Sequence, residues 1–141
     1  MTIKQISLFL ENKFGRLSEL LNILSKADVH IVSATVADTS DYGLMRLITS
    51  DQQRAAKVLK ENGVLVSLNE VVAICIDPLA ADFSRVVDLF TKRGINIEYM
   101  YCFNFAAKLV LVMRCSDLDA VREVVRDNNL TFITDTDLMK M

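Results

Sequence analysis

The sequence predicts an α+β fold in which two tandem βαββαβ units pair side by side into one eight-stranded antiparallel sheet, with four helices on one face. Three observations predict this class. They are the order of strand-like and helix-like apolar patterns, an internal repeat that aligns without a gap, and a junction that has no Gly-, Ser- or Pro-rich linker. The 141 residues suffice for one ordinary domain or two very small ones.

The first copy, residues 1–68, contains short apolar runs that alternate with helical patterns. The first helix carries apolar residues at i, i+3, i+4 and i+7, which predicts that all four face the core: Leu17, Leu20, Leu21 and Leu24. Helices are expected after the first and third strands, and the strands are expected at 6–10, 29–37, 44–49 and 64–68. This order is typical of a ferredoxin-like unit.

Local signals define where these elements begin and end. The polar stretch 38–43 predicts a hairpin turn between the second and third strands. Ser50 and Gln53 have the spacing of a capping box, which predicts the start of the second helix, and Asn62-Gly63 predicts its end.

The second copy, residues 69–141, repeats this order when 66 is added to each residue number. Identical residues pair in this way: Ser18 with Ser84, Lys26 with Lys92, Ile31 with Ile97, Ser50 with Ser116, Asp51 with Asp117, Val58 with Val124 and Asn62 with Asn128. The apolar stripe recurs as Phe83, Val86, Val87 and Phe90. The repeat therefore predicts two copies of one fold in rigid contact.

Two expected strands of the second copy, 71–76 and 109–113, are apolar at both parities. A strand with one solvated face should instead alternate between apolar and polar residues. Because the helices cover only one sheet face, we expect a second subunit to cover the other, in a homodimer.

Charge argues against two classes of partner. The chain has 16 basic and 18 acidic residues, interspersed, and a net charge of −2, so no basic field exists to hold nucleic acid or an anionic membrane. The aromatic stripe of Tyr99, Tyr101, Phe103 and Phe105 resembles the stacking platform of RNA-binding sheets. The basic and aromatic pattern of those modules is absent, which favours an interface or core role for the stripe.

The cysteines indicate a reducing compartment. Cys75, Cys102 and Cys115 are odd in number and lie in apolar strand-like runs, which predicts small buried side chains without a disulfide framework. No apolar core of a signal peptide follows Met1, so we expect a cytoplasmic protein. The sequence has no metal-ligand cluster, nucleophile–base pair or phosphate loop, so we expect no metal, no cofactor and no catalysis.

The stretch with the clearest functional chemistry is the polar turn 11–17 between the first strand and the first helix. Backbone N–H groups at a helix start favour a carboxylate or phosphate. Gly15 lacks a Cβ, so the chain can bend there and a small ligand can approach the backbone. The candidate ligand-binding residues are Asn12, Lys13, Phe14, Gly15, Arg16 and Leu17. A simpler interpretation makes Asn12 and Gly15 turn and cap residues only.

Together with the repeat, this turn resembles the ACT domain family, whose βαββαβ modules regulate amino-acid metabolism by binding amino acids between paired copies. The stretch 12–17, Asn-Lys-Phe-Gly-Arg-Leu, is similar to the family's Asn-x-Pro-Gly-x-Leu turn, with Phe14 in place of Pro. The strand starts 28–31, Asp-Val-His-Ile, and 94–97, Gly-Ile-Asn-Ile, are similar to the family's Gly-Val-Asn-Ile.

The resemblance implies where a ligand would bind. In the serine-binding ACT domains of phosphoglycerate dehydrogenase, the ligand lies between the turn of one copy and the strand-start Asn of its neighbour. Here the turn 12–17 would face Asn96 and Ile97. The reciprocal site, the turn Asp77–Ala81 with His30, is degenerate because Pro78 and Ala81 replace the Asn and the Gly, and His30 is a weaker candidate.

The resemblance therefore implies a stand-alone regulatory protein without catalysis. It would bind a free amino acid at the interface between its two ACT-like domains and signal amino-acid status to a metabolic enzyme partner. The alternative is a module for protein interaction or oligomerisation whose turn binds no ligand.

Overall fold

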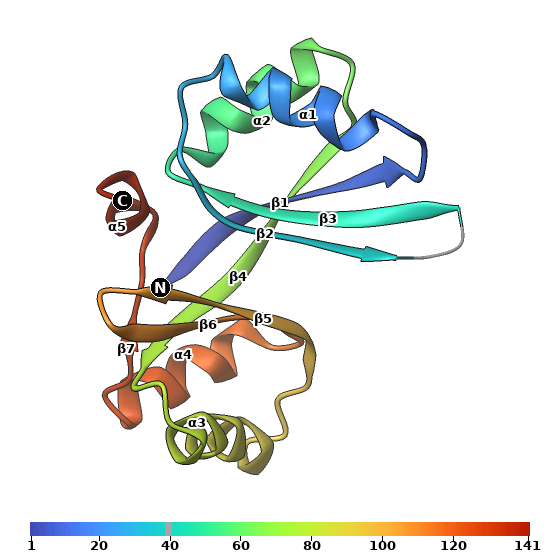
Figure 1. The fold of residues 1–141 in the computed structure, drawn as a ribbon. Helices are drawn as coiled ribbons and strands as arrows, with labels where there is room; N and C mark the ends of the chain where they lie inside the picture. Colours follow the sequence, from blue (N-terminus) through green and yellow to red (C-terminus); the bar gives the residue numbers. More distant parts are fainter. Residues whose placement is uncertain (39–40) are drawn as a thin grey trace. The chain divides into compact units, whose positions relative to one another are not determined.

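The structure, a computed structural model, describes residues 1–38 and 41–141 (Figure 1). Residues 39 and 40 of the expected hairpin turn lie outside the described residues. The elements, in chain order, are β1 (Thr2–Glu11), α1 (Arg16–Ser25), β2 (Ile31–Asp38), β3 (Tyr42–Thr49), α2 (Gln52–Glu61), β4 (Val66–Ile76), α3 (Ala80–Lys92), β5 (Ile97–Phe105), β6 (Lys108–Cys115), α4 (Leu118–Asp127), β7 (Thr131–Phe132) and α5 (Asp135–Met139). The α+β class and the repeated βαββαβ order are confirmed.

The number of elements differs from the expectation. Within residues 1–38 and 41–141 the structure has seven strands, because the strands expected at 64–68 and 71–76 form the single strand β4. The polar residues Asn69 and Glu70 lie inside β4 and do not break it. The additional helix α5 has five residues, which is too short for a helical period to show in the sequence.

The chain forms two compact units. The first unit contains residues 4–69 and 135–141, and the second contains residues 1–3 and 70–134. Neither unit is one contiguous stretch of the sequence.

In the first unit, β3 lies between β2 and β1, and both pairs are antiparallel. Helices α1 and α2 lie on one face of these strands (Figure 1). The buried core between helices and strands consists of Ile6, Leu8, Leu20, Leu24, Met45, Leu47, Ala55, Ala56 and Leu59.

In the second unit, β6 lies between β4 and β5, and β7 pairs with β4; all these pairs are antiparallel. Helices α3 and α4 lie on one face (Figure 1). The buried core includes Val72, Ile74, Val86, Phe90, Leu111, Met113, Val121 and Val124.

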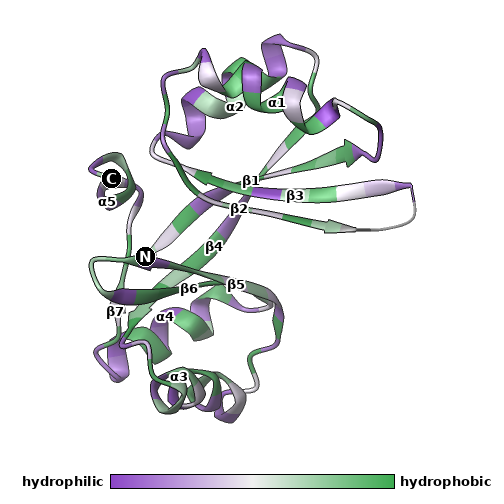
Figure 2. Ribbon diagram, viewed as in Figure 1, coloured by the Kyte–Doolittle hydropathy of each residue, from purple (hydrophilic) through white to green (hydrophobic). Residues whose placement is uncertain are grey.

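The four long helices mix hydrophobic and hydrophilic residues along their length, as Figure 2 shows. In α1 only half of the expected stripe is buried. Leu20 and Leu24 are buried, whereas Leu17 and Leu21 are 43% and 39% exposed, so the expectation that all four face the core was wrong. Leu20 and Leu24 are spaced i, i+4 and lie above one another on the core side. Leu17 and Leu21 have the same spacing and form a second, more exposed row on the helix. Val86 and Phe90, the repeat equivalents of Leu20 and Leu24, are buried in the same way.

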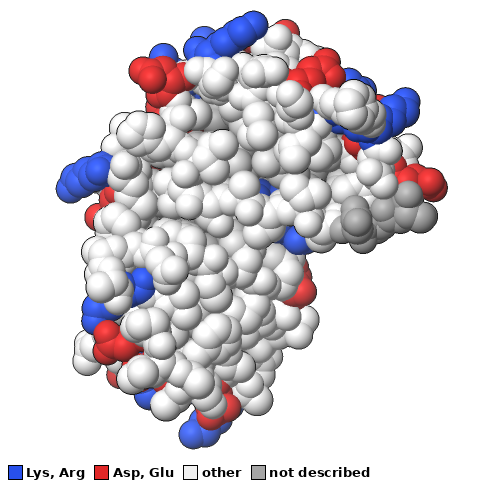
Figure 3. All heavy atoms as spheres, viewed as in Figure 1, with Lys and Arg blue, Asp and Glu red and all other residues white. Residues whose placement is uncertain are grey.

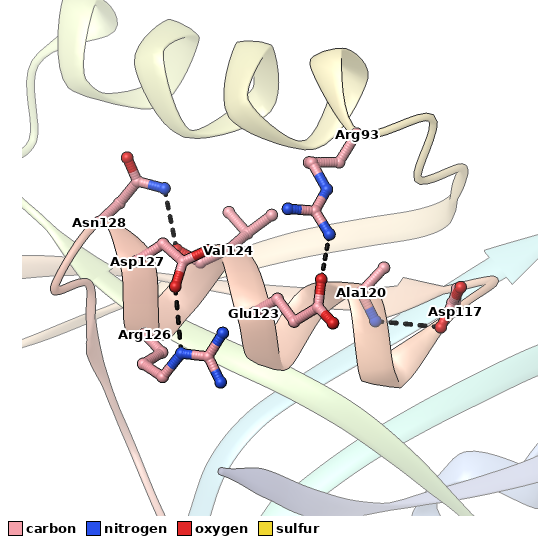
Figure 4. Close-up of polar contacts among 8 residues, drawn as sticks. All are labelled: Arg93, Asp117, Ala120, Glu123, Val124, Arg126, Asp127 and Asn128. Atoms are coloured by element: carbon pink, nitrogen blue, oxygen red, sulfur yellow. Dashed lines mark hydrogen bonds and ion pairs between the residues drawn. The ribbon is translucent and has the colours of Figure 1, made fainter.

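The repeat extends to individual hydrogen bonds. Asp51 caps α2 by accepting a bond from the Arg54 N–H at 3.1 Å. Asp117 caps α4 by accepting from the Ala120 N–H at 3.0 Å (Figure 4). The capping box expected to start at Ser50 is therefore wrong by one residue. The Ser50 hydroxyl instead accepts the His30 N–H.

The helix ends repeat as well. The side-chain amide of Asn128 donates to the Val124 carbonyl at 3.0 Å (Figure 4). Asn62 makes the equivalent bond to Val58 at 2.9 Å. In the second unit, Arg93 at the end of α3 also forms an ion pair with Glu123 of α4.

Two left-handed backbone positions recur at the repeat spacing, with different residues. Gly63 has φ +77° where Asn129 has φ +49°, and Asp28 has φ +53° where Gly94 has φ +68°. Glycine enters this region without steric penalty, and Asn and Asp are the side chains that enter it most readily.

The strands that are apolar at both parities are buried within a single chain. Val110, Leu111, Val112 and Met113 of β6 are all 0% exposed. The same holds for β4, where Val71, Val72, Ala73 and Ile74 are all 0% exposed. The argument that these strands require a second subunit was therefore wrong, and the homodimer stays a prediction without that support.

The cysteines differ in burial. All three are free: Cys115 is buried, Cys75 is half-buried and Cys102 is exposed. The expectation of three buried thiols was wrong for Cys102 because β5 is the last strand in its sheet order. Burial raises the pKa of the Cys115 thiol to about 11, with a smaller contribution from Glu98. In the described parts of the chain, no helix is both long enough and apolar enough to span a membrane.

Candidate functional site

The turn 11–17 joins the end of β1 to the start of α1. Gly15 is the N-cap residue of α1 and has φ +83°, a left-handed conformation that a side chain would strain. No described side chain caps this helix start or that of α3, whereas Asp51 and Asp117 cap α2 and α4. The dipole of α1 therefore points its positive end at a position that a ligand's negative group could fill.

Charged side chains surround this helix start. Glu11 bonds to Lys13 at 3.0 Å and to Arg16 at 3.1 Å, and Arg16 also bonds to Glu19 at 3.1 Å. Lys13, and then Arg16, lower the pKa of the Glu11 carboxyl. Glu19, and then Glu11, raise the pKa of Arg16. The arrangement holds the Arg16 guanidinium between two carboxylates beside the turn.

Two candidate residues of the turn present apolar surface. Phe14 is fully exposed and Leu17 is 43% exposed. The Asn12 N–H donates to the Asp41 carbonyl at 3.3 Å, which ties the turn to the chain that precedes β3. The turn is thus anchored through its backbone while its apolar side chains face solvent.

A cavity of about 290 Å³ lies beside the turn, entirely within the first unit. Its lining consists of Phe9, Leu10, Glu11, Arg16, Glu19, Leu20, Ile23, Asn62, Gly63, Val64 and Leu65. Pockets for small molecules usually measure ~300–1,000 Å³, so this volume suits a ligand at the small end of that range.

Of the candidate residues, only Arg16 lines this cavity. Sequence analysis missed Glu19, Ile23 and the stretch 62–65. The Asn62-Gly63 pair carries a signal for the end of a helix, and nothing local indicates that this end lies beside the turn.

The reciprocal turn is built differently. Helix α3 begins at Ala80, so Ala81 lies inside the helix and not at the bend that Gly15 forms. This corrects the placement of Ala81 at the turn. A cavity of about 290 Å³ lies here too, lined by Pro78, Leu79, Ala80, Phe83, Ser84 and Leu109, with Ser84 as its single hydroxyl-bearing residue. Asp77 holds Lys108 at 2.5 Å and raises its pKa.

The two strand-start residues have the same backbone bonds. The Asn96 N–H donates to the Ser116 hydroxyl at 3.1 Å and the His30 N–H donates to the Ser50 hydroxyl at 2.9 Å. Each serine N–H in turn donates to the carbonyl of the same partner, at 3.0 and 2.9 Å. Asn96 precedes β5 in the second unit, with Ile97 as the first residue of that strand. Its pairing with the turn 12–17 stays a prediction.

The side chain of His30 also has a contact of its own, beyond the backbone bonds that it shares with Asn96. Its ring Nδ1 lies 3.2 Å from the carbonyl oxygen of Met141. Met141 belongs to the segment 135–141, which clusters with the first unit.

The described residues hold no group of three His, Cys, Asp or Glu side chains that could bind a metal ion. On the face drawn in Figure 3, basic and acidic side chains are interspersed and no patch of one sign forms. The site at the turn therefore offers hydrogen bonds, a helix start, a small cavity and paired charges of both signs.

The fold and the turn define a pair of ACT domains. The family model of the ACT domain pair matches residues 1–141, so the chain belongs to the ACT domain family. The recognition of tandem ACT domains in the sequence is confirmed. The chain thus has an ACT-domain regulatory fold.

Solved structures agree with this assignment. The chain is similar to protein BT0572 from Bacteroides thetaiotaomicron, with 34% identity, a TM-score of 0.94, and coverage of 100% of this chain and 98% of that one. The ligand-free regulatory subunit of aspartate kinase from Thermus thermophilus shares the fold at 17% identity, with a TM-score of 0.59 and coverage of 88% and 91%. The E. coli aspartokinase III complex with lysine and aspartate shares it at 16% identity, with a TM-score of 0.50 and coverage of 90% of this chain and 31% of that one. A search of curated proteins returned no match.

Proposed function

We propose that this chain is a non-catalytic regulatory protein that binds one free amino acid at the turn 12–17 and passes amino-acid status to a metabolic enzyme. The observation that carries the proposal is the start of α1, which has a left-handed Gly15 and no side-chain cap among the described residues. An amino-acid carboxylate would supply the missing cap.

The remaining groups of an amino acid also find partners in this proposal. The side-chain carbonyl oxygens of Asn12 and Asn96 would accept bonds from the ligand's ammonium group. The candidate contacts are Asn12, Lys13, Phe14, Gly15, Arg16, Leu17, Asn96 and Ile97. The cavity beside Arg16 offers room for a ligand side chain, with Leu20 and Ile23 as its apolar wall.

A thermal-shift screen of the twenty standard amino acids tests the proposal. A ligand that binds only the folded state at 100 times its dissociation constant stabilises that state by about 2.7 kcal/mol. One amino acid, or a few of related chemistry, should raise the Tm. If none does, the alternative of a pure interaction module takes its place.

Variants then locate the site. Asn12→Ala and Asn96→Ala should each weaken binding by about 1–3 kcal/mol in a calorimetric titration, because each leaves a polar partner unsatisfied. Asn22→Ala, an exposed change on α1, is the matched control and should leave the dissociation constant unchanged. Equal loss in the control would show that the effect reflects helix stability and not contact with the ligand.

A further inference from the structure

The segment 135–141 lies outside the internal repeat. By the repeat, residue 135 corresponds to Asn69, which lies within the continuous strand β4. After β7 the chain instead forms α5 and clusters with residues 4–69. The first copy has no counterpart to this segment.

Three observations place the segment against the first unit. The Lys4 N–H donates to Asp135 Oδ1 at 3.2 Å. The Leu138 side chain is 1% exposed. The carbonyl oxygen of Met141 lies 3.2 Å from His30 Nδ1, and since a carbonyl can only accept, the ring nitrogen must donate.

The contact with Met141 is made by His30, which has a repeat equivalent in the second unit. His30 and Asn96 are repeat equivalents whose backbones make the same pair of bonds to Ser50 and Ser116. The fold therefore presents both side chains from matching strand starts. At His30 the segment itself supplies the polar partner of the strand-start side chain, through the main-chain oxygen of Met141.

The segment leaves open space beside it. A cavity of about 320 Å³ remains beside it, with a lining that includes Thr49, Gln52, Asp135 and Leu138. Buried Leu138 and the two polar bonds at Asp135 and Met141 contribute to its hold on the first unit.

We propose that the segment 135–141 is an internal ligand that occupies the His30 position, so that an amino acid binds only at the site that includes Asn96. This inference rests on the proposed function. It explains why one ligand would bind per chain, because the segment already occupies the second position. Loss of the segment should open the second position.

The test compares the full chain with a variant that lacks residues 135–141, using calorimetric titration with L-serine and with each amino acid that raises the Tm of the full chain. The expected result is one site in the full chain and two in the shortened chain. One site in both overturns the internal ligand and leaves the proposed function intact. No site in the full chain overturns the proposed function, and the inference that rests on it falls too, whether or not the shortened chain binds an amino acid.

Because Leu138 is buried, the shortened chain could fail to fold. The full-length double variant Asp135→Ala, Leu138→Ala loosens the segment without removing it, with Lys140→Ala as an exposed matched control. His30 is the sole histidine, so its ring gives one set of NMR signals. These signals should move in the double variant and hold in the control, and a ring signal that is identical in all three proteins would overturn the contact with Met141.

Discussion

Gln52 shows how one side chain can separate two copies of the same fold. It is buried in the first unit, where Leu118 stands at the repeat-equivalent position of the second. Its amide oxygen accepts from the Thr49 N–H at 3.0 Å and hydroxyl at 2.8 Å, and its amide nitrogen donates to the carbonyls of Lys4 at 2.6 Å and Leu47 at 3.0 Å. All four hydrogen-bonding positions of the amide are thus used.

Replacing Gln52 by Leu should destabilise the protein even though the second copy tolerates Leu at this position. The change removes the acceptor of the Thr49 N–H and hydroxyl and the donor to two carbonyls, and each buried group that is left unsatisfied costs about 1–3 kcal/mol. Urea unfolding followed by circular dichroism measures the loss. Gln53→Leu, on the exposed next residue, is the control, and an equal effect there would contradict this account of Gln52.

Glu11 should titrate below its ordinary value of 4.5, because Lys13 and then Arg16 stabilise the carboxylate. A lowered pKa in the folded state means that this carboxylate stabilises the fold at neutral pH, and that the contribution is lost as pH falls through the lowered pKa. NMR titration of the Glu11 carboxyl carbon measures it.

The largest cause can be removed separately. Lys13→Ala should raise the Glu11 midpoint, while Lys26→Ala, an exposed lysine after α1, should not. Because the groups are exposed, 1 M salt should also raise the midpoint. A midpoint that ignores both Lys13 and salt would refute the charge network.

Helices α2 and α4 begin at repeat-equivalent residues, and each has an Asp as its N-cap. Asp51→Ala and Asp117→Ala should each cost about 0.5–2 kcal/mol of stability, since an N–H at the helix start loses its acceptor. Denaturant unfolding of each variant measures this cost. Asp→Asn at the same positions keeps an acceptor and should remain close to the original, and failure of Asn to rescue would mean that charge dominates the cap.

The elements that sequence reasoning predicted are those with local signals. Helices α2 and α4 carry a cap, an apolar stripe and a stop within their own residues. β4 was divided in two because Asn69 and Glu70 look like a junction, although a strand tolerates polar residues that face solvent. The cavity lining at 62–65 and the contact of His30 with Met141 join residues far apart in sequence, so no local pattern encodes them.

Strand β6 is buried in a single chain, so its burial does not require association with a second subunit. Backbone amides of Val110, Val112 and Met113 should be protected from hydrogen exchange to the same degree at low and high protein concentration. Exchange measured over a hundredfold dilution tests this. Protection that falls on dilution would restore a second subunit as the cover of this strand.

At the two repeated left-handed positions, each copy of the fold holds a residue that differs from its equivalent in the other copy. Gly63 stands where the second copy has Asn129, and Asp28 stands where it has Gly94. The two copies therefore show that glycine and a short polar residue can each occupy the same left-handed position. Glycine avoids the steric cost of this conformation but loses more freedom on folding, by roughly 0.5–1 kcal/mol, so the two choices nearly balance. A chimera that transfers such a residue between copies should therefore keep its stability, whereas transfer of Leu118 into position 52 should not.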